Sequence, residues 1–297
     1  MVVDSGHVPS VTKKMIADIT RLTNKPVRFL VNTHWHPDHV SGNSLYGDRW
    51  PGVAIVSTPS TQFELTRPDS LYDDLTEMNK YMPAIEKALT SGKRGDGQPL
   101  SDGERNYYTE VLLEAKFMQP ELKATPKAPP TVTFDKRMVV DLGGRKVEIS
   151  FLGRGNTGGD AVIYVPDAKI LITGDLLVAP TPFAIGSFID EWIATMKVLA
   201  AIDVTTIVPG HGPVEHDKQH MLLVTQALEV LSQQAHAAVK QGVTQEQFQK
   251  SVDMAPFRTK MAGTDEALRR NFDQYFVTSE AVRPYRETKE GPLKDEN

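Results

Sequence analysis

Short apolar runs alternate with longer amphipathic stretches along the chain, and this pattern predicts an α/β protein. Apolar residues recur at helical spacing between Ser10 and Asn24, which predicts a helix there. The apolar run Val27–Val31 that follows is typical of a buried strand. Further strands are expected at these apolar runs: Val53–Val56, Met138–Leu142, Val147–Leu152 and Ala161–Pro166.

The region 61–122 is charged and amphipathic, unlike the apolar runs on either side of it. Two helical runs, Leu71–Leu89 and Ser101–Met118, are separated by the Gly-rich hinge Ser91–Gly97. We therefore expect a helical insertion within the α/β fold. A lid over a site, a dimer interface and a packing buttress are three interpretations of it.

The region 216–297 is predicted to be helical, because apolar residues recur there at helical spacing. Another helix is expected over Asp190–Ala201, which opens with acidic residues. A chain of 297 residues with 40% hydrophobic content can bury one large core. We expect residues 1–297 to form a single domain that includes the insertion and the C-terminal helical region.

Composition narrows the classes of function. The net charge is −5 and no Lys/Arg-rich tract occurs, which argues against a nucleic-acid partner and favours a small-molecule substrate. The absence of cysteine excludes disulfides, thiolate metal ligands and a cysteine nucleophile.

Membrane and export signals are not evident in the sequence. No apolar stretch approaches the roughly 20 residues of a membrane span, and no basic segment precedes an apolar one at the N-terminus. As given, the chain is expected to be cytoplasmic with no membrane partner. A truncated N-terminus would make it periplasmic or secreted.

The run Thr33–His39, directly after the strand expected at Val27–Val31, is the densest group of metal-binding side chains. It holds three of the eight histidines and one aspartate. In an extended segment His34 and His36 lie on the same side, while Pro37 forces a turn that directs Asp38 and His39 elsewhere. This spacing predicts a metal site that serves two ions.

His34, His36, Asp38 and His39 match the HxHxDH signature of the metallo-β-lactamase superfamily, and the chain resembles that family. The resemblance implies an αβ/βα four-layer sandwich with two metals at one edge. Three further motifs resemble the family's in the expected order: Val2–Gly6 with its Asp4, Leu171–Asp175, and Ile207–Gly212.

The resemblance also implies the roles of individual residues. Its implied metal ligands are His34, His36, Asp38, His39, Asn156, Asp175 and His211. Asp38 and Asp175 are the implied catalytic residues: Asp38 orients a metal-bound hydroxide, and Asp175 bridges or tunes the pair of ions. Zinc is the implied metal, and iron and manganese are alternative occupants.

Asn156 departs from the family pattern, which usually has a histidine in this Gly-x-Gly-His-Thr stretch. An amide oxygen binds zinc more weakly than an imidazole nitrogen. We therefore expect one tight ion at Asp38, His39 and His211, with Asp175 between the two sites. A second, weaker ion is expected at His34 and His36.

Two other patterns are weaker. Gly153-x-Gly155-x-x-Gly158 fits the dinucleotide fingerprint, but a strand rather than a helix follows it, so no nucleotide site is expected. His216 and His220 have the spacing of a zinc pair on a helix, yet no third ligand accompanies them. We interpret them as part of a solvated helix face.

The favoured function is a zinc-dependent hydrolase in which metal-bound hydroxide attacks the carbonyl of a β-lactam, a lactone or a related ester or thioester. Two alternatives are a mononuclear iron oxidase or dioxygenase and a non-catalytic metal-binding module with a degraded site. The family fold does not choose among substrates. Because Asp4 arrives so early, an exposed sheet edge is expected, and a homodimer is one way to cover it.

Overall fold

The computed structural model describes residues 1–67, 74–95, 97–278, 282–291 and 293. The chain divides into two compact units, and each is described by itself. Unit 1 comprises Met1–Asn32, His36–Ile55 and Glu64–Thr131; unit 2 comprises Thr33–Trp35, Val56–Phe63 and Val132–Asn297. That all 297 residues fold as one cooperative domain stays a prediction.

Unit 1 begins with a small α/β arrangement. Its elements are β1 (Val2–Val3), α1 (Pro9–Leu22), β2 (Phe29–Val31), α2 (Pro37–Val40), α3 (Asn43–Arg49) and the start of β3 (Ala54–Ser57). Strands β1 and β2 pair in parallel, with Val2 opposite Leu30. Ile16 of α1 packs with Leu30, Tyr46 and Trp50 in the core of this unit, whereas Val11 and Leu22, near the two ends of the helix, are exposed.

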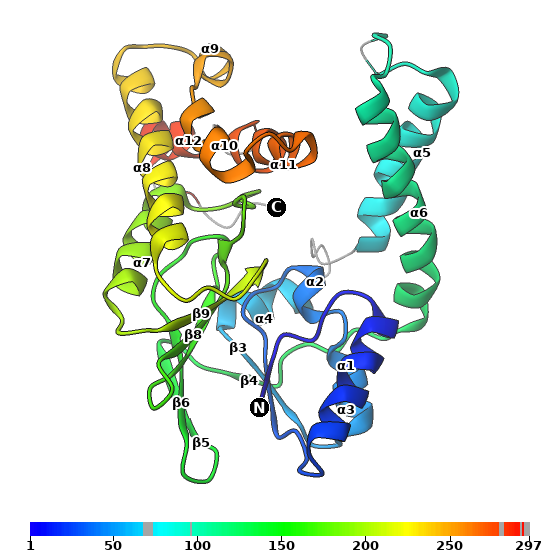
Figure 1. Cartoon of the computed structure of the whole chain (residues 1–297), viewed down its shortest axis with the longest axis vertical. Coiled ribbons are helices and arrows are strands. Elements are labelled where there is room, and N and C mark those ends of the chain that lie inside the picture. The colour runs from blue at the N-terminus through cyan, green and yellow to red at the C-terminus, as the bar shows by residue number, and fades with distance from the viewer. Residues whose placement is uncertain (68–73, 96, 279–281, 292, 294–297) are drawn as a thin grey trace. The chain divides into compact units, whose positions relative to one another are not determined.

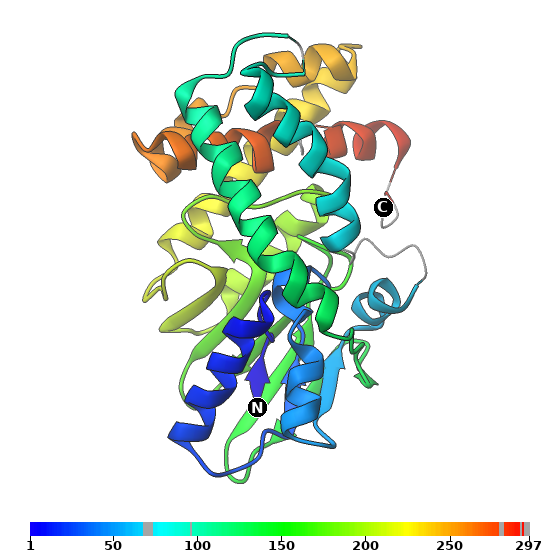
Figure 2. The same ribbon diagram turned by 90° about the vertical axis from the view of Figure 1, so that its right-hand side faces the viewer.

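Two long helices of unit 1, α5 (Asp74–Ser91) and α6 (Asp102–Ala124), form an antiparallel pair (Figures 1 and 2). They confirm the two helices predicted in the insertion, although residues 71–73 of the first lie outside the described residues. Ser101 begins α6 with a capping box, in which its hydroxyl accepts from the Glu104 backbone N–H. Near the end of α6, Glu121 Oε2 accepts from the Ser10 backbone N–H at 2.6 Å, so the insertion is anchored to the start of α1.

Unit 2 contains a five-stranded sheet in the order β5-β6-β7-β8-β9. The strands are β5 (Arg137–Asp141), β6 (Lys146–Phe151), β7 (Ala161–Val165), β8 (Ile170–Val178) and β9 (Thr206–His211). Pairing is antiparallel from β5 to β8, whereas β8 and β9 are parallel, with Leu171 opposite Ile207. The end of β3 pairs in parallel with β4 (Val132–Thr133), and the second sheet has the order β1-β2-β3-β4. The predicted strands at these positions are confirmed.

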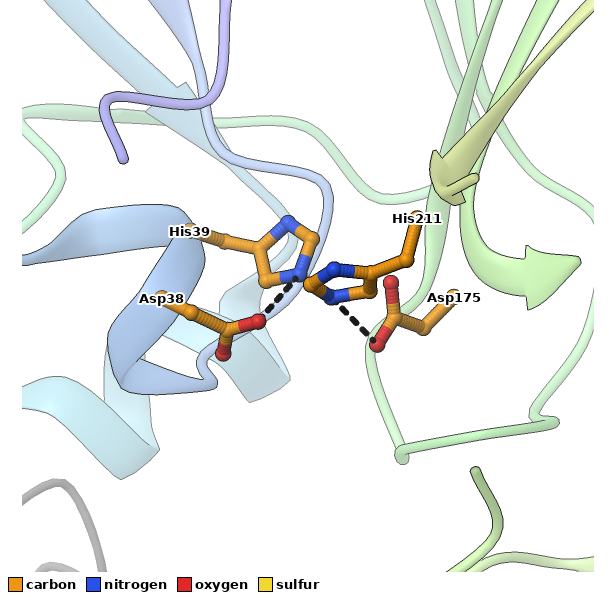
Figure 3. A group of neighbouring side chains, drawn as sticks. All are labelled: Asp38, His39, Asp175 and His211. Atoms are coloured by element: carbon orange, nitrogen blue, oxygen red, sulfur yellow. Dashed lines mark ion pairs between the residues drawn. The ribbon is translucent and has the colours of Figure 1, made fainter. Parts of the chain in front are cut away.

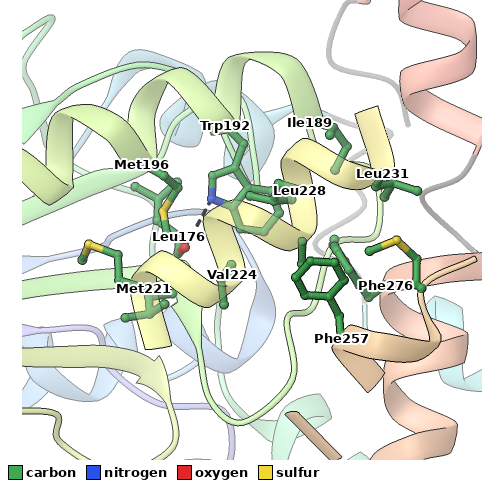
Figure 4. Close-up of a cluster of buried hydrophobic side chains, with 14 of the residues drawn as sticks. Leu176, Ile189, Trp192, Met196, Met221, Val224, Leu228, Leu231, Phe257 and Phe276 are labelled. Atoms are coloured by element: carbon green, nitrogen blue, oxygen red, sulfur yellow. Dashed lines mark hydrogen bonds between the residues drawn. The ribbon is translucent and has the colours of Figure 1, made fainter. Parts of the chain in front are cut away.

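Helices supply the rest of unit 2 and its core. They are α7 (Ile189–Ala201), α8 (Gln219–Lys240), α9 (Gln245–Ser251), α10 (Ala255–Ala262), α11 (Glu266–Phe272), the π-helix η1 (Asp273–Thr278) and α12 (Val282–Glu290); α4 (Pro59–Thr66) spans the division between the units. Trp192 of α7 is 1% exposed and lies among Leu176, Val224 and Leu228, while its indole N–H donates to the Leu176 carbonyl (Figure 4). The strand that carries Asp175 is therefore packed directly against this core.

Helix α12 brings charged side chains to the buried side of α7 and α8. Burial raises the pKa of Glu287 to about 7, and the nearby carboxylate of Asp190 adds to the rise. Asp190 itself accepts from the Ser232 hydroxyl and lies 3.0 Å from His236 Nε2. Arg283 stacks over the Phe188 ring, with 4.8 Å between its guanidinium carbon and the ring centroid.

Three predicted boundaries need correction. Strand β8 continues to Val178 instead of ending at Asp175, with a register shift at Gly174. Within the helical region expected over 216–297, α11 changes to π-helix at Asp273. His216 precedes α8, so His216 and His220 do not lie on one helix. No helix among the described residues is long and apolar enough to cross a membrane.

Candidate metal centre

The predicted metal loop is divided between the two units. Thr33–Trp35 belongs to unit 2, and His36 with the residues that follow belongs to unit 1. Each unit therefore holds its own group of candidate ligands. Unit 1 carries His36, Asp38 and His39, and unit 2 carries His34, Asn156, Asp175 and His211.

In unit 1 the ligands lie at the start of α2, a single helical turn. His36 precedes the helix in extended backbone, and Pro37 is its first residue, where a missing N–H costs nothing. His39 Nδ1 lies 2.7 Å from Asp4 Oδ2, and its Nε2 lies 3.2 Å from Asp38 Oδ2. Asp4 thus holds one nitrogen of the ring and leaves Nε2 directed to Asp38.

The backbone reinforces this arrangement. The Ser5 N–H donates to the His39 carbonyl at 2.7 Å, which ties the segment after β1 to α2. Asp4 has a φ of 57°, a left-handed conformation that aspartate and asparagine adopt more readily than most residues. The side chain of His39 is only 4% exposed, whereas that of Asp38 is 31% exposed. Unit 1 therefore presents a fixed imidazole beside a more accessible carboxylate.

In unit 2 a buried carboxylate lies within reach of two imidazoles. Asp175 Oδ2 lies 3.7 Å from His34 Nε2 and 3.6 Å from His211 Nε2. His34 is fully buried, and its Nδ1 lies 3.0 Å from the Thr33 hydroxyl, so Nε2 is again the nitrogen directed to the carboxylate. Figure 3 draws the carboxylate and imidazole pair of each unit, Asp38 with His39 and Asp175 with His211.

In unit 2 a glycine precedes each of two candidate ligands: Gly174 precedes Asp175, and Gly210 precedes His211. Close packing explains both glycines. A Cβ on Gly210 would lie 1.9 Å from Asp175 Oδ1, a distance that no side chain tolerates. Gly174 has a φ of +53°, and a Cβ there would lie 2.7 Å from Thr33. Both glycines therefore allow the Asp175 strand to approach the neighbouring backbone and the Thr33 segment closely.

Asn156 lies in the loop between β6 and β7, and its side chain is almost completely buried. The amide N–H of Asn156 donates to the Phe183 carbonyl. Its Oδ1 has no hydrogen-bond partner among the described residues. A buried amide oxygen without a partner is costly unless something else binds it, and a cation is a suitable partner.

The donor chemistry of both groups fits a divalent metal. Imidazole nitrogen and carboxylate oxygen are the donors that zinc takes in proteins without cysteine. The candidate ligands comprise two imidazoles and one carboxylate in each unit: His36, His39 and Asp38 in unit 1, and His34, His211 and Asp175 in unit 2. The unpartnered oxygen of Asn156 adds a weaker donor to the unit 2 group.

Two further histidines, His216 and His220, are not among the candidate ligands. His220 Nε2 lies 2.9 Å from the Val178 carbonyl, at the end of β8, and the residue is half-buried. His216 is exposed. The Gly153-x-Gly155-x-x-Gly158 pattern leads into β7, which confirms that the helix of a dinucleotide site does not follow it.

Two residues that position the imidazoles were not expected in that role. The sequence places Asp4 in a family motif but gives no sign of its bond to His39, because the two are 35 residues apart. Thr33 is adjacent to His34, and only the structure shows its hydroxyl beside Nδ1. In general, a histidine that binds a metal through one ring nitrogen uses the other to hydrogen-bond a nearby residue, and such a residue should be sought for each histidine ligand.

Comparison with known proteins gives one family and several distant relatives. A family model described as the metallo-beta-lactamase superfamily matches residues 1–211. A linear primary-alkylsulfatase from a Pseudomonas strain is 24% identical over 95% of this chain, and the chain spans about half, 52%, of that relative's length. Metallo-beta-lactamase IND-1 from Chryseobacterium indologenes is 26% identical over 59% of this chain and 76% of its own.

A solved structure of similar fold is a metallo-beta-lactamase from Pontibacter korlensis. It aligns with a TM-score of 0.50 and 22% identity, and the alignment covers 76% of this chain and 81% of that one. At this level of identity the likeness concerns the fold and carries no information about substrate.

Proposed function

We propose that this chain, which belongs to the metallo-beta-lactamase superfamily, is a metal-dependent hydrolase that acts on alkyl sulfate esters. The predicted fold of that superfamily is confirmed. The observation that carries the substrate class is the extent of the similarity to the alkylsulfatase. It covers 95% of the chain, whereas the family model ends at residue 211.

The ligands of both groups lie close together in the sequence. His34 and His36 are separated by one residue, so the ligands of the two units are joined by a single short segment. That segment carries the HxHxDH signature of the superfamily. We propose that these ligands bind metal ions, with the buried Asp175 as a carboxylate ligand in unit 2.

A bound zinc ion lowers the pKa of water to about 7 and so supplies hydroxide at neutral pH. We propose zinc for this role, with iron and manganese as alternatives for the same donors. Asp4 and Thr33 fix the ring orientation of His39 and His34. Asp38, the more exposed carboxylate, orients the attacking water, and the apolar loop at Phe183 contacts the alkyl chain.

Sulfate release from a medium-chain primary alkyl sulfate tests this proposal. The purified, zinc-supplemented protein should release sulfate, and a chelator should abolish the activity. Asp38→Asn should greatly reduce turnover, whereas Asp48→Asn, outside both ligand groups, should leave it intact. Metal-loaded protein that releases no sulfate would exclude this substrate class.

A second candidate is hydrolysis of a β-lactam or lactone ring, the class favoured by the sequence. Similarity to IND-1 and to a type 2 enzyme from Bacillus cereus, 23% identical over 72% of this chain, supports it. Ring opening measured with the same preparation separates the two candidates. Opening of a β-lactam without sulfate release would favour this second function.

We also propose that one ion binds more tightly than the other. The weaker site is that of His34, where Asn156 offers an amide oxygen, a weaker donor than the imidazole usual in the family. Metal analysis after dialysis should give about one retained ion per chain. Asn156→His should raise this stoichiometry, and an unchanged value would contradict the assignment of the weaker site.

A further inference from the structure

The two polar atoms of the Asn156 side chain have different surroundings. Its side chain is 1% exposed, its Nδ2 donates to the Phe183 carbonyl, and its Oδ1 has no partner among the described residues. Because the amide is planar, the bond at Nδ2 fixes the direction of Oδ1 as well. The oxygen is therefore held in one orientation without a protein group to satisfy it.

The loop that carries Asn156 lies between the segments that deliver His34 and Asp175. On one side, a Cβ on Gly155 would lie 2.3 Å from Leu176, the neighbour of Asp175. On the other side, the Ala161 N–H donates to the Thr33 carbonyl at 2.7 Å, next to His34. All of these residues belong to unit 2. The segment around Asn156 therefore packs against the segments of both His34 and Asp175, whose side chains lie 3.7 Å apart.

The loop is also internally braced. Asp160 accepts from the Thr157 backbone N–H at 2.9 Å and from its hydroxyl at 2.8 Å. Thr58 and Thr61 donate their hydroxyls to the Gly159 carbonyl. These bonds fix the backbone around Asn156, so its amide has little freedom to turn Oδ1 away.

The other end of Asn156 holds the apolar loop that follows β8. The Phe183 ring lies 5.2 Å from the Tyr275 ring, and the Ala184 N–H donates to the Tyr275 carbonyl at 2.9 Å. The Phe188 N–H returns to the Gly155 carbonyl at 2.8 Å. The segment 179–188 is thus tied to the Asn156 loop at its centre and at its end.

We propose that Asn156 couples metal binding to the order of the segment 179–188. Its Oδ1 binds the ion held by His34 and Asp175, while its Nδ2 holds the Phe183 carbonyl in place. Coordination of the oxygen draws electron density from the amide and makes its N–H a stronger donor to Phe183. This inference rests on the proposed metal centre and makes Asn156 a positioning residue for the wall that contacts an apolar substrate group.

The coupling is reciprocal. If the metal strengthens the bond to Phe183, then a substrate that orders the same segment must tighten metal binding by the same factor. If the segment 179–188 is fully ordered only when the metal is bound, substrate affinity is low in the metal-free protein. The segment is then a specificity element that depends on metal occupancy.

Hydrogen exchange with and without zinc tests the coupling on the full chain. In the wild type, zinc should slow exchange of the Ala184 and Phe188 amides severalfold, and zinc binding is measured separately by calorimetry. Asn156→Asp is the matched variant, because it keeps an oxygen ligand but replaces the N–H donor. It should bind zinc at least as tightly, yet zinc should no longer protect 179–188.

The possible results distinguish a failure of the coupling from a failure of the proposed function. Protection in the wild type that is lost in Asn156→Asp supports the coupling. Zinc binding without protection in the wild type, or equal protection in Asn156→Asp, overturns the coupling and leaves the metal centre standing. No zinc binding by the wild type overturns both. Asn24→Asp, an exposed position in unit 1, controls for the added charge and should behave as the wild type.

Discussion

The two ligand groups have the same kinds of donor but are built in different ways. In unit 2, Asp175 is 3% exposed and is carried by a nine-residue strand that packs on the main core. In unit 1, Asp38 is 31% exposed and is carried by a four-residue helix. The unit 2 group is fixed by packing, whereas the unit 1 group depends on a few hydrogen bonds, chiefly the one that His39 Nδ1 donates to Asp4. We therefore expect the two groups to respond differently to substitution.

The largest effect is expected at the packed group. Asp175→Asn should lower metal affinity and turnover by more than the ~10–100-fold typical of residues that act through a ligand, because a weaker amide donor replaces the charged carboxylate proposed to bind the ion directly. The variant should remain folded, since the side chain keeps its size. Metal content, turnover and circular dichroism are the measurements. Asp167→Asn, an exposed carboxylate of unit 2 paired with Arg145, is the control and should change none of them.

The next effect compares the residues that hold the two rings. Asp4→Asn should reduce metal affinity by about tenfold or more, because it replaces a charge-assisted bond to His39 with a neutral one. Asparagine suits the left-handed backbone at this position. Thr33→Val, which removes the neutral hydroxyl beside His34, should cost less. Zinc competition with a chelator dye measures both, and an equal or reversed order would contradict the contrast between the groups.

A smaller effect concerns the charged cluster of α12 in unit 2. Burial raises the pKa of Glu287 to about 7 from an ordinary value of 4.5. Between these two values the folded protein keeps a proton that the unfolded chain has released, so this group makes stability fall as the pH rises through that window. Glu287→Gln should therefore raise the melting temperature at pH 8 and change it little at pH 4.

Glu290→Gln provides the matched control on the same helix. Glu290 is an exposed carboxylate that pairs with Arg286 one turn away. Its replacement should leave the dependence of melting temperature on pH as it is in the wild type. A flat difference between Glu287→Gln and the wild type from pH 4 to 8 would show that Glu287 does not titrate in this window.

The smallest effect asks how far the two units unfold together. Ser101 in unit 1 and Thr244 in unit 2 both begin helices with a capping box. Ser101→Ala and Thr244→Ala should each cost about 1 kcal/mol of stability. If the chain is one domain, as its sequence predicts, both variants shift a single thermal transition. Two transitions, each moved by only one variant, would show that the units unfold separately.

Regular features of the site were predictable from the sequence, because they depend on neighbouring residues. The apolar runs predicted β3, β5, β6 and β7, and the Thr33–His39 run predicted the ligand-rich loop. Amphipathic spacing likewise predicted α1, α5 and α6. In each case the local period of the side chains is enough to specify the element.

The rest depends on contacts between distant segments, which a single sequence does not display. The bond between Asp4 and His39 joins residues 35 positions apart. The extension of β8 beyond Asp175 is stabilised by parallel pairing with β9, where Val178 lies opposite His211. His220 is directed by the Val178 carbonyl rather than by its spacing from His216. These three features are therefore set by tertiary contacts.

The amide at position 156 has a consequence for how this protein can change over generations. Codons for Asn become codons for His or Asp when the first base alone is altered. Either mutation would exchange the donor to the ion, and Asp would also remove the N–H that holds the Phe183 carbonyl. A single base substitution to an Asp codon would therefore strengthen metal retention and weaken the order of the segment 179–188. Both properties would change in one mutational step.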